Sequence, residues 1–178
     1  MLDALELAFM NEPLLILEFG SGSGIVSAFL SKMYTKSLIL GCDVNIDACN
    51  CTRRVASVDT IHVDVLKLKL RSKIDLIVCN PPYVPTEDSK LLNTTNRLEW
   101  SWAGGENGMQ FTEILLNRAS SLLSDHGSLI FLLIAQNNPV KIVRDAHLYN
   151  LTGSIILERK AGIERIFVCK FSKIFRTN

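Results

Sequence analysis

The sequence predicts an α/β fold, in which a seven-stranded, mostly parallel sheet is covered by helices on both faces and carries one antiparallel strand at an edge. Three observations predict it. Apolar runs of strand length alternate with amphipathic stretches of helix length along most of the 178 residues, which is typical of a parallel sheet buried on both faces. A glycine-rich turn follows the first apolar run, at 20–24. The last two apolar runs are joined by a short turn, as the strands of a hairpin are.

Each element follows from the local pattern. The first helix is expected at 2–10, and Pro13 ends it. The expected strands are the apolar runs 14–19, 37–42, 60–63, 74–79, 128–135, 153–159 and 162–171. Further helices are expected at 24–34, 46–57, 106–123 and 138–149. The irregular segment 80–105 is long for a compact domain, and such loops tend to be functional. Because no repeat or linker interrupts the pattern, we expect 1–178 to form a single domain.

The composition narrows the classes of protein. Apolar residues make up 48% of the chain, which is enough to form a core. The formal net charge of +1 does not indicate a binder of polyanions, so nucleic acid is not an expected partner. Five cysteines and an acidic opening segment without a signal-peptide pattern favour the cytoplasm or the nucleus. We expect no membrane span, because no apolar run approaches about 18 residues. Cys49 and Cys51 lack a second pair nearby, so we expect no metal site.

The glycine-rich turn predicts a cofactor site. Glycines let the backbone turn sharply and approach a ligand, and the start of the following helix offers free N–H groups. A dinucleotide fingerprint needs a glycine at position 25, where this chain has Ile. The spacing Glu18-x-Gly20-Ser21-Gly22-x-Gly24 instead resembles motif I of class I methyltransferases. That resemblance implies S-adenosylmethionine as the cofactor, with Glu18 serving its amino group. A plain tight turn between strand and helix is the alternative interpretation.

Acidic residues follow the next two strands. Asp43 can accept two hydrogen bonds from ribose hydroxyls, although it could instead cap the following helix, as Asn45 or Asp47 could. Asp64 stands where the methyltransferase pattern has the acceptor for the adenine amine. His62 we interpret as a strand side chain rather than a catalytic base. The carboxyl ends of parallel strands meet at one edge of the sheet, so Glu18, Asp43 and Asp64 should converge there.

The segment Asn80-Pro81-Pro82-Tyr83 predicts the reaction. Two prolines cannot continue a central strand and therefore form a rigid turn where the chain leaves the sheet. The Asn80 side-chain oxygen and the Pro81 carbonyl can each accept one N–H of a planar amide or amine. Those bonds strengthen as positive charge grows on the nitrogen, which stabilises the transition state. Tyr83 can stack on the planar group. The alternative is a strand end that prolines merely terminate.

Together these residues resemble a known family. LEFGSGSG at 17–24, Asp43, DLIVCNPPYVPT at 75–86 and WAGGENG at 102–108 resemble the HemK-like glutamine methyltransferases, in their short eukaryotic and archaeal branch. The resemblance implies a Rossmann-like class I methyltransferase fold and methylation of the glutamine in the Gly-Gly-Gln loop of the class I translation release factor. It implies that glutamine binds at Asn80, Pro81, Pro82 and Tyr83. It places the cofactor among Glu18, Gly20, Ser21, Gly22, Gly24, Asp43, Val44, Asp64, Val65 and Asn80.

The resemblance also implies a partner. This branch is similar to enzymes that need a small zinc-binding activator subunit. Such a subunit typically pairs with the edge of the sheet near the third strand. The segment 60–66 is short and rich in β-formers, and an open edge of that kind invites strand addition. Family members usually carry a Tyr-Glu-Pro-Ala-Glu-Asp-like segment just before the first helix, where it helps to cover the cofactor, whereas this chain begins at Met1-Leu2-Asp3.

Other functions stay open at this stage. The Asn-Pro-Pro-Tyr motif is shared with adenine-amine nucleic-acid methyltransferases, and lysine methylation is also compatible with the family. Base flipping usually needs extra recognition surface, which this chain does not show. Alternating basic residues at 67–73 are explained as a solvated face. A binding module that keeps the fold without turnover is the non-enzymatic alternative.

Overall fold

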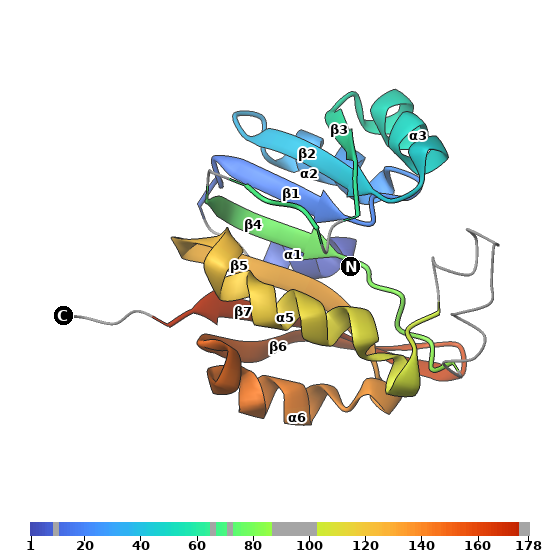
Figure 1. Cartoon of the computed structure of the whole chain (residues 1–178), viewed down its shortest axis with the longest axis vertical. Coiled ribbons are helices and arrows are strands. Elements are labelled where there is room, and N and C mark those ends of the chain that lie inside the picture. Colours follow the sequence, from blue (N-terminus) through green and yellow to red (C-terminus); the bar gives the residue numbers. More distant parts are fainter. Residues whose placement is uncertain (9–10, 65–66, 71–72, 87–102, 175–178) are drawn as a thin grey trace.

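The sheet has seven strands in the order β3-β2-β1-β4-β5-β7-β6 (Figure 1). The computed structural model describes residues 1–8, 11–64, 67–70, 73–86 and 103–174. The strands are β1 (Leu15–Phe19), β2 (Leu38–Asp43), β3 (Asp59–His62), β4 (Ile74–Cys79), β5 (Leu123–Ile134), β6 (Leu151–Ala161) and β7 (Glu164–Lys173). Strands β1 to β5 pair in parallel. The predicted α/β class and the strand number are confirmed.

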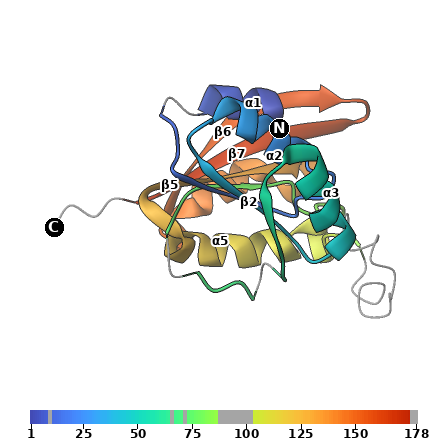
Figure 2. The same cartoon turned by 90° about the horizontal axis from the view of Figure 1, so that it is seen from above.

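Helices cover both faces of this sheet, as predicted. Figure 2 shows α1 and α2 on one side and α5 on the other. The α-helices are α1 (Leu2–Ala8), α2 (Ile25–Met33), α3 (Ile46–Ala56), α5 (Gln110–Leu122) and α6 (Pro139–Arg144). Short 3-10 turns are η2 (Glu106–Gly108), η3 (Ala135–Asn137) and η4 (Asp145–Tyr149). No helix among the residues described is long and apolar enough to cross a membrane.

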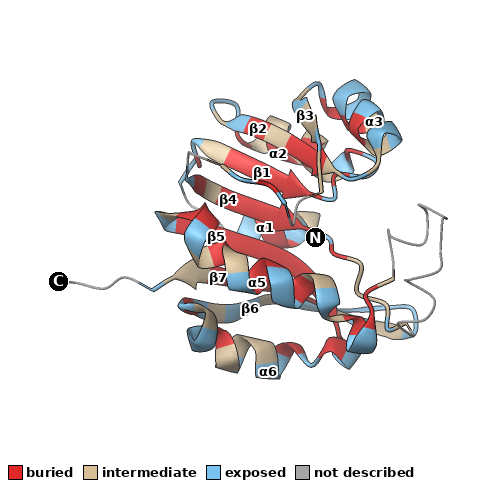
Figure 3. Ribbon diagram, viewed as in Figure 1, coloured by how far each residue is buried: buried red, intermediate tan, exposed pale blue. Residues whose placement is uncertain are grey.

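The side chains of the central strands contribute to two separate hydrophobic cores, one on each face of the sheet. Side chains of a strand point to opposite faces in turn, so Ile16 packs with Leu5 and Leu30 on the α1–α2 side. Its neighbour Leu17 packs with Leu115 and other side chains of α5 on the opposite side. Figure 3 shows the resulting buried band along β1, β4 and β5, whereas exposed residues lie on the helices, in the connecting segments and on the outer strands. The near-continuous apolar runs of the sequence reflect this double burial.

The C-terminal hairpin corrects one expectation. The C-terminal strand β7 is antiparallel, as predicted, but it does not lie at the edge where we expected it, because it pairs with both β5 and β6 and lies between them. The edge strand is β6, and most of its residues are exposed. Val168, Cys169 and Phe171 of β7, in contrast, are fully buried. The more apolar strand of the hairpin therefore takes the interior position, because it buries more apolar surface there.

Several helix and strand ends differ from the predicted ones. The expected helix 106–123 is broken, because Asn107 and Gly108 have positive φ angles, and the α-helix begins only at Gln110. The expected helix 138–149 is α-helical only to Arg144 and continues as the 3-10 turn η4. Strand β5 begins five residues before Ser128, across a register shift in its pairing with β4. The polar run Ser-Asp-His-Gly at 124–127 hides this extension, because it has no apolar alternation.

Candidate active site

The carboxyl ends of the central strands bring the predicted site residues to one edge. Phe19, the last residue of β1, pairs with Cys42 on one side and with Cys79 on the other. The next residue of each strand therefore meets its neighbours, so Gly20 lies between Asp43 and Asn80. Strand order reverses between β1 and β4 (Figure 1), and ligands of open parallel sheets bind at such switch points.

The glycine loop is fixed by bonds to the end of β2. The N–H groups of Gly20 and Ser21 donate to the Cys42 carbonyl, at 2.8 and 3.1 Å. The Gly22 N–H donates to Asp43 Oδ2 at 3.0 Å. Gly20 has a φ of +68°, and an added Cβ there would meet nothing within 4 Å. Its backbone thus faces open space in a conformation that favours glycine, as a backbone that receives a ligand must.

A threonine that the sequence analysis did not single out supports this loop from α3. Thr52 is fully buried and its Oγ1 donates to Ser21 Oγ at 2.9 Å. A Cβ on Gly24 would lie 2.7 Å from the Thr52 Cα, so the loop packs against the helix backbone without room for a side chain. Nothing in the sequence marks Thr52 except its place on the inward face of a helix.

Glu18 is a buried acid beneath the loop. Its side chain is 3% exposed, and it accepts a hydrogen bond from the Ser27 hydroxyl. The pKa of Glu18 is raised to about 7, mainly because the carboxyl is buried; the hydrogen bonds from Ser27 lower the pKa, and the nearby Asp43 charge contributes to the rise. A carboxylate in such surroundings gains much from a cationic partner.

The acids after β2 and β3 have different surroundings. Asp43 bridges two backbone segments, because its Oδ1 accepts from the Asn45 N–H at 2.8 Å while its Oδ2 holds the glycine loop. The helix cap that we considered for Asp43 is made by Asn45, whose side chain accepts from the Asp47 N–H. Asp64 is half-buried and forms a surface ion pair with Lys67 at 3.4 Å. Val65 lies outside the described residues.

Val44, another predicted cofactor residue, follows Asp43 and contacts His62 of β3. Val44 is exposed, and its carbonyl lies 2.9 Å from His62 Nε2. His62 is the last residue of β3 and its ring is exposed. Its place on the strand agrees with a side chain of the sheet edge, and the ring contact ties that edge to the β2–α3 connection.

The Asn-Pro-Pro-Tyr segment forms the turn at the end of β4. Asn80 is exposed, whereas Pro81 is buried and Pro82 and Tyr83 are half-buried. The pKa of the Tyr83 phenol is raised, first by burial and then by the Glu164 carboxylate of the C-terminal hairpin. The phenol is therefore neutral and lies near the hairpin. Asn80 and Gly20 follow the paired residues Cys79 and Phe19, which places both at the same edge of the sheet.

The segment 103–108 packs under this turn. The Gly104 N–H donates to the Val84 carbonyl at 2.8 Å, and the Thr86 N–H donates to the Gly105 carbonyl at 3.0 Å. A Cβ on Gly104 would lie 2.5 Å from the Pro82 carbonyl oxygen, and one on Gly108 would overlap the Tyr83 carbonyl. The glycines of this segment are thus needed for a close approach of two backbones. Trp102 of the same motif lies outside the described residues.

A second residue that the sequence analysis missed joins these segments. Asn137, in the turn after β5, is 3% exposed, and its side-chain nitrogen donates to the carbonyls of Tyr83 and Asn107. The signal that could have found it is the Asn-Asn-Pro run at 137–139. It begins three residues after the end of β5, whereas Asn80 follows β4 directly.

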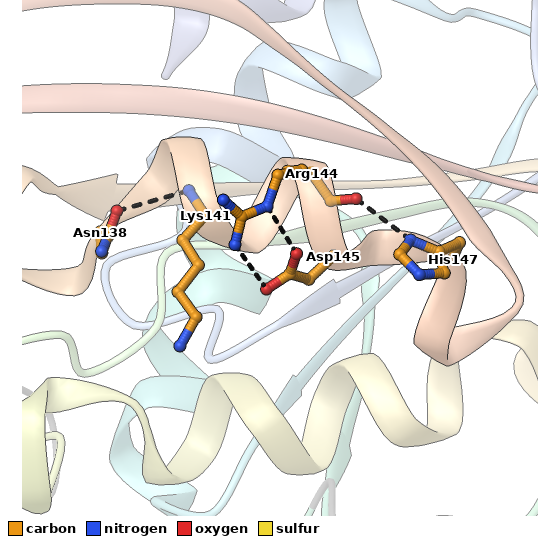
Figure 4. A network of polar contacts seen from close by, with 5 residues as sticks. All are labelled: Asn138, Lys141, Arg144, Asp145 and His147. Atoms are coloured by element: carbon orange, nitrogen blue, oxygen red, sulfur yellow. Dashed lines mark hydrogen bonds and ion pairs between the residues drawn. The ribbon is translucent and has the colours of Figure 1, made fainter.

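A cavity of about 670 Å³ lies behind the turn, between the start of α5 and the α6–η4 segment. Asn107 and Asn137 line it together with charged residues such as Glu113 and Lys141. Figure 4 shows the α6–η4 side of it, where Asp145 is paired with Arg144. Although large pockets are a usual first guess for a binding site, this one holds none of the predicted cofactor or substrate residues, which lie at the carboxyl edge of the sheet.

The residues at that edge fit S-adenosylmethionine. Gly20 offers a bare backbone to open space, and Glu18 is a buried acid without a cation beside it among the residues described. An amino acid cofactor with a charged amino group and a ribose suits this set of donors and acceptors, with Glu18 and the glycine loop on the methionine part and Asp43 on the ribose. When bound there, it supplies a methyl group on a sulfonium.

Comparison with known proteins decides the family. The family model described as "Methyltransferase small domain" matches residues 3–98. The human protein Methyltransferase HEMK2 is 36% identical over 184 residues, which cover 97% of this chain and 85% of the human protein. The chain belongs to the HEMK2 methyltransferases. As a HEMK2 family member, it is an S-adenosylmethionine-dependent methyltransferase.

Further relatives of this HEMK2 family member support the same family assignment. The eRF1 methyltransferase catalytic subunit mtq2 of Schizosaccharomyces pombe is 30% identical, over 98% of this chain and 84% of that protein. Among solved structures, the E. cuniculi Mtq2–Trm112 complex, described as responsible for the methylation of the eRF1 translation termination factor, contains a chain that superimposes with a TM-score of 0.73. Its identity is 22%, over 97% of this chain and 92% of that chain, so this likeness concerns the fold.

Proposed function

We propose that this HEMK2 family member methylates the side-chain amide nitrogen of the glutamine in the Gly-Gly-Gln motif of a class I translation release factor. The observation that carries the proposal is the Asn80–Tyr83 turn, which lies beside the glycine loop and is backed by the glycine segment 103–108. Activity on eRF1, which the name of the fission yeast relative states, supports the choice of substrate.

The chemistry requires placement more than a strong base. An amide nitrogen is a poor nucleophile, because its lone pair is shared with the carbonyl, so its approach to the methyl group must be in line and fixed. We propose that the Asn80 side-chain oxygen and the Pro81 carbonyl each accept one N–H of the target. Positive charge grows on the nitrogen as the N–C bond forms and the S–C bond breaks, and both hydrogen bonds strengthen with it. The methylated nitrogen then releases one proton to water.

Rigidity of the turn supports this role. Pro81 is buried, and both prolines have fixed φ angles. Tyr83 is half-buried, and its neutral ring can stack on the planar amide. A turn that does not move keeps the two acceptors at the separation of the two amide protons, and this preorganisation lowers the barrier.

We propose a partner at the other end of the sheet, a small zinc-binding activator that pairs with the edge near residues 60–66. Strand β3 ends the sheet and pairs only with β2 among the strands described. An open strand edge of this kind receives an added strand readily. The Mtq2 chain of similar fold was solved in complex with Trm112, which agrees with a partner of this class. Methylation of a release factor would place the pair in the cytoplasm.

The decisive experiment is methyl transfer by the complex of this chain with the activator. Mass spectrometry should find one added methyl group on the Gly-Gly-Gln glutamine of the release factor. A factor with that Gln replaced by Asn, which keeps the amide but draws it back by one methylene, should remain unmodified. Modification of the replaced factor at the same level would contradict the proposal.

Two further arms separate the alternatives. Saturable labelling of DNA would favour an adenine methyltransferase, and labelling of lysine in the release factor would favour a lysine methyltransferase. Calorimetry of the complex with S-adenosylmethionine addresses the binding-module alternative, because a module without turnover that had lost its cofactor would release no heat. We expect saturable binding at one site for each chain.

A further inference from the structure

Asn137 connects three segments of the chain behind the Asn80–Tyr83 turn. Its Oδ1 accepts from the Ile134 N–H at 2.9 Å, which attaches it to the end of β5. Its Nδ2 donates to the Tyr83 carbonyl at 3.1 Å and to the Asn107 carbonyl at 3.0 Å. The side chain is 3% exposed, so all three bonds are shielded from water and a lost partner would not be replaced cheaply.

We infer that Asn137 is a positioning residue for methyl transfer, which holds the Asn80–Tyr83 turn in its productive place by clamping the Tyr83 carbonyl. The inference rests on the proposed function. Asn80 and Pro81 must present two acceptors to one planar nitrogen, and Tyr83 ends the same four-residue turn. Fixing the Tyr83 carbonyl to β5 prevents the turn from pivoting about the end of β4.

The chemistry of the position requires an amide of this length. Three partners converge on it, namely two carbonyl oxygens that need donors and one N–H that needs an acceptor. A primary amide has two donors and an acceptor at one end of a side chain, and this also sets its orientation here. An aspartate would face two carbonyl oxygens with a carboxylate and would repel both.

The Tyr83 carbonyl occupies space that a side chain at position 108 would fill. A Cβ on Gly108 would overlap that carbonyl and would lie 2.8 Å from Asn137 Nδ2. The absence of a side chain at Gly108 is therefore what lets the carbonyl reach the amide. Two separate features of the chain, an amide and a glycine, serve the same contact.

The test is Asn137→Asp in the complex with the activator. We expect kcat on the release factor to fall about ten- to a hundredfold at pH 8, because small misplacement of reacting groups has effects of that size. The dissociation constant for S-adenosylmethionine should stay within about twofold, because the glycine loop is held by other bonds. As the pH falls to 6, kcat relative to wild type should recover in part, since a protonated carboxyl can donate to one carbonyl again.

The adjacent residue provides a matched control. Asn138 is exposed, and its side-chain oxygen only accepts, from the Lys141 N–H (Figure 4). Asn138→Asp therefore keeps its contact while adding the same charge one residue away, and it should leave kcat and its pH profile as in wild type. The ionisable groups that line the same cavity, Glu106, Glu113, Lys141, Asp145 and Tyr149, are common to both variants, so their titration cancels in the comparison.

A second readout does not depend on the substrate. In Asn137→Asp at pH 8, hydrogen exchange of the Thr86 and Gly104 amides should accelerate by about tenfold or more, because their bonds link the turn to the segment 103–108. The Gly24 amide should keep its wild-type rate. Gly108→Ala should reproduce both effects if the contact is the cause.

The outcomes separate the two proposals. Absence of activity in the wild-type complex would contradict the proposed function, and the exchange experiment would still decide the role of Asn137. Wild-type kcat and exchange in Asn137→Asp at pH 8 would overturn the inference. So would equal losses of cofactor binding and kcat without recovery at pH 6, because these would indicate a general loss of structure.

Discussion

At the scale of single residues, Glu18 carries a measurable signature. Burial raises its pKa from 4.5 to about 7, so the folded protein binds a proton more tightly than the unfolded chain between those values. Stability that depends on this group is therefore fully present below pH 4.5 and is lost as the pH rises through about 7. The shift corresponds to about 3 kcal/mol at most, since one pKa unit is worth about 1.4 kcal/mol.

We expect Glu18→Gln to remove this pH dependence. The amide oxygen can still accept from the Ser27 hydroxyl, but it carries no charge to desolvate. Between pH 5 and pH 8, wild type should lose about 2–3 kcal/mol of unfolding free energy relative to the variant. Chemical denaturation of both proteins at the two pH values measures this difference. Parallel stability profiles of variant and wild type would show that Glu18 does not titrate in this range.

At the scale of elements, the predictable features were those with a periodic signal. The run IDLIVC at 74–79 predicted β4 with both ends correct, because a strand buried on both faces is apolar at nearly every position, and only Asp75 departs from that pattern here. The order of β6 and β7 was not predictable in this way, since pairing across a hairpin does not say which strand meets β5. It depends on which strand has more to bury.

The residues of the candidate site also differ in whether a local sequence pattern marks them. Gly20, Asp43 and Asn80 were predictable because each follows a recognisable strand, and parallel strands end together. Asn137 and Thr52 were not singled out, because their roles depend on contacts across 54 and 31 residues of sequence, respectively. A side chain that supports another segment has no local pattern of its own.

The edge strand β3 provides the next prediction. The Val63 N–H donates to the Asp43 carbonyl at 2.9 Å, and successive residues of a strand point their N–H groups to opposite sides. The Thr60 N–H therefore points away from β2, toward the open edge. Thr60→Pro removes that donor and adds bulk to the edge, so we expect retention of the activator to fall about tenfold.

Co-purification of the activator on the tagged chain measures this effect. Thr60→Val is the matched control, because it keeps the N–H and the β-branched shape and removes only the hydroxyl, which accepts from Arg53 at 2.7 Å. It should retain the activator as wild type does. Equal retention by the proline variant would exclude strand addition at this edge as the mode of binding.

At the scale of the whole molecule, distant parts of the chain meet on one face of the sheet. Leu5 of α1 packs in the same core as Val168 of β7. Asp3 pairs with Arg159 of β6 at 2.7 Å, and the Lys170 ammonium donates to the Ala8 carbonyl at 3.1 Å. The sequence predicted α1 as a helix but not its position, because the amphipathic pattern shows which face is buried without showing what covers it.

This arrangement supports the proposal that 1–178 acts as one catalytic domain, and it predicts how the molecule unfolds. Leu5 is fully buried whereas Leu7 of the same helix is 67% exposed, so the two make a matched pair. Leu5→Ala should lower the unfolding free energy by about 2–4 kcal/mol through the cavity it leaves, and Leu7→Ala by less than about 0.5 kcal/mol. In calorimetry of the complex, Leu5→Ala should shift the transition of this chain as a single step, by roughly 5–15 °C. A variant in which α1 detaches early while the main transition stays in place would show that the helix is an appendage, and that the sheet folds without it.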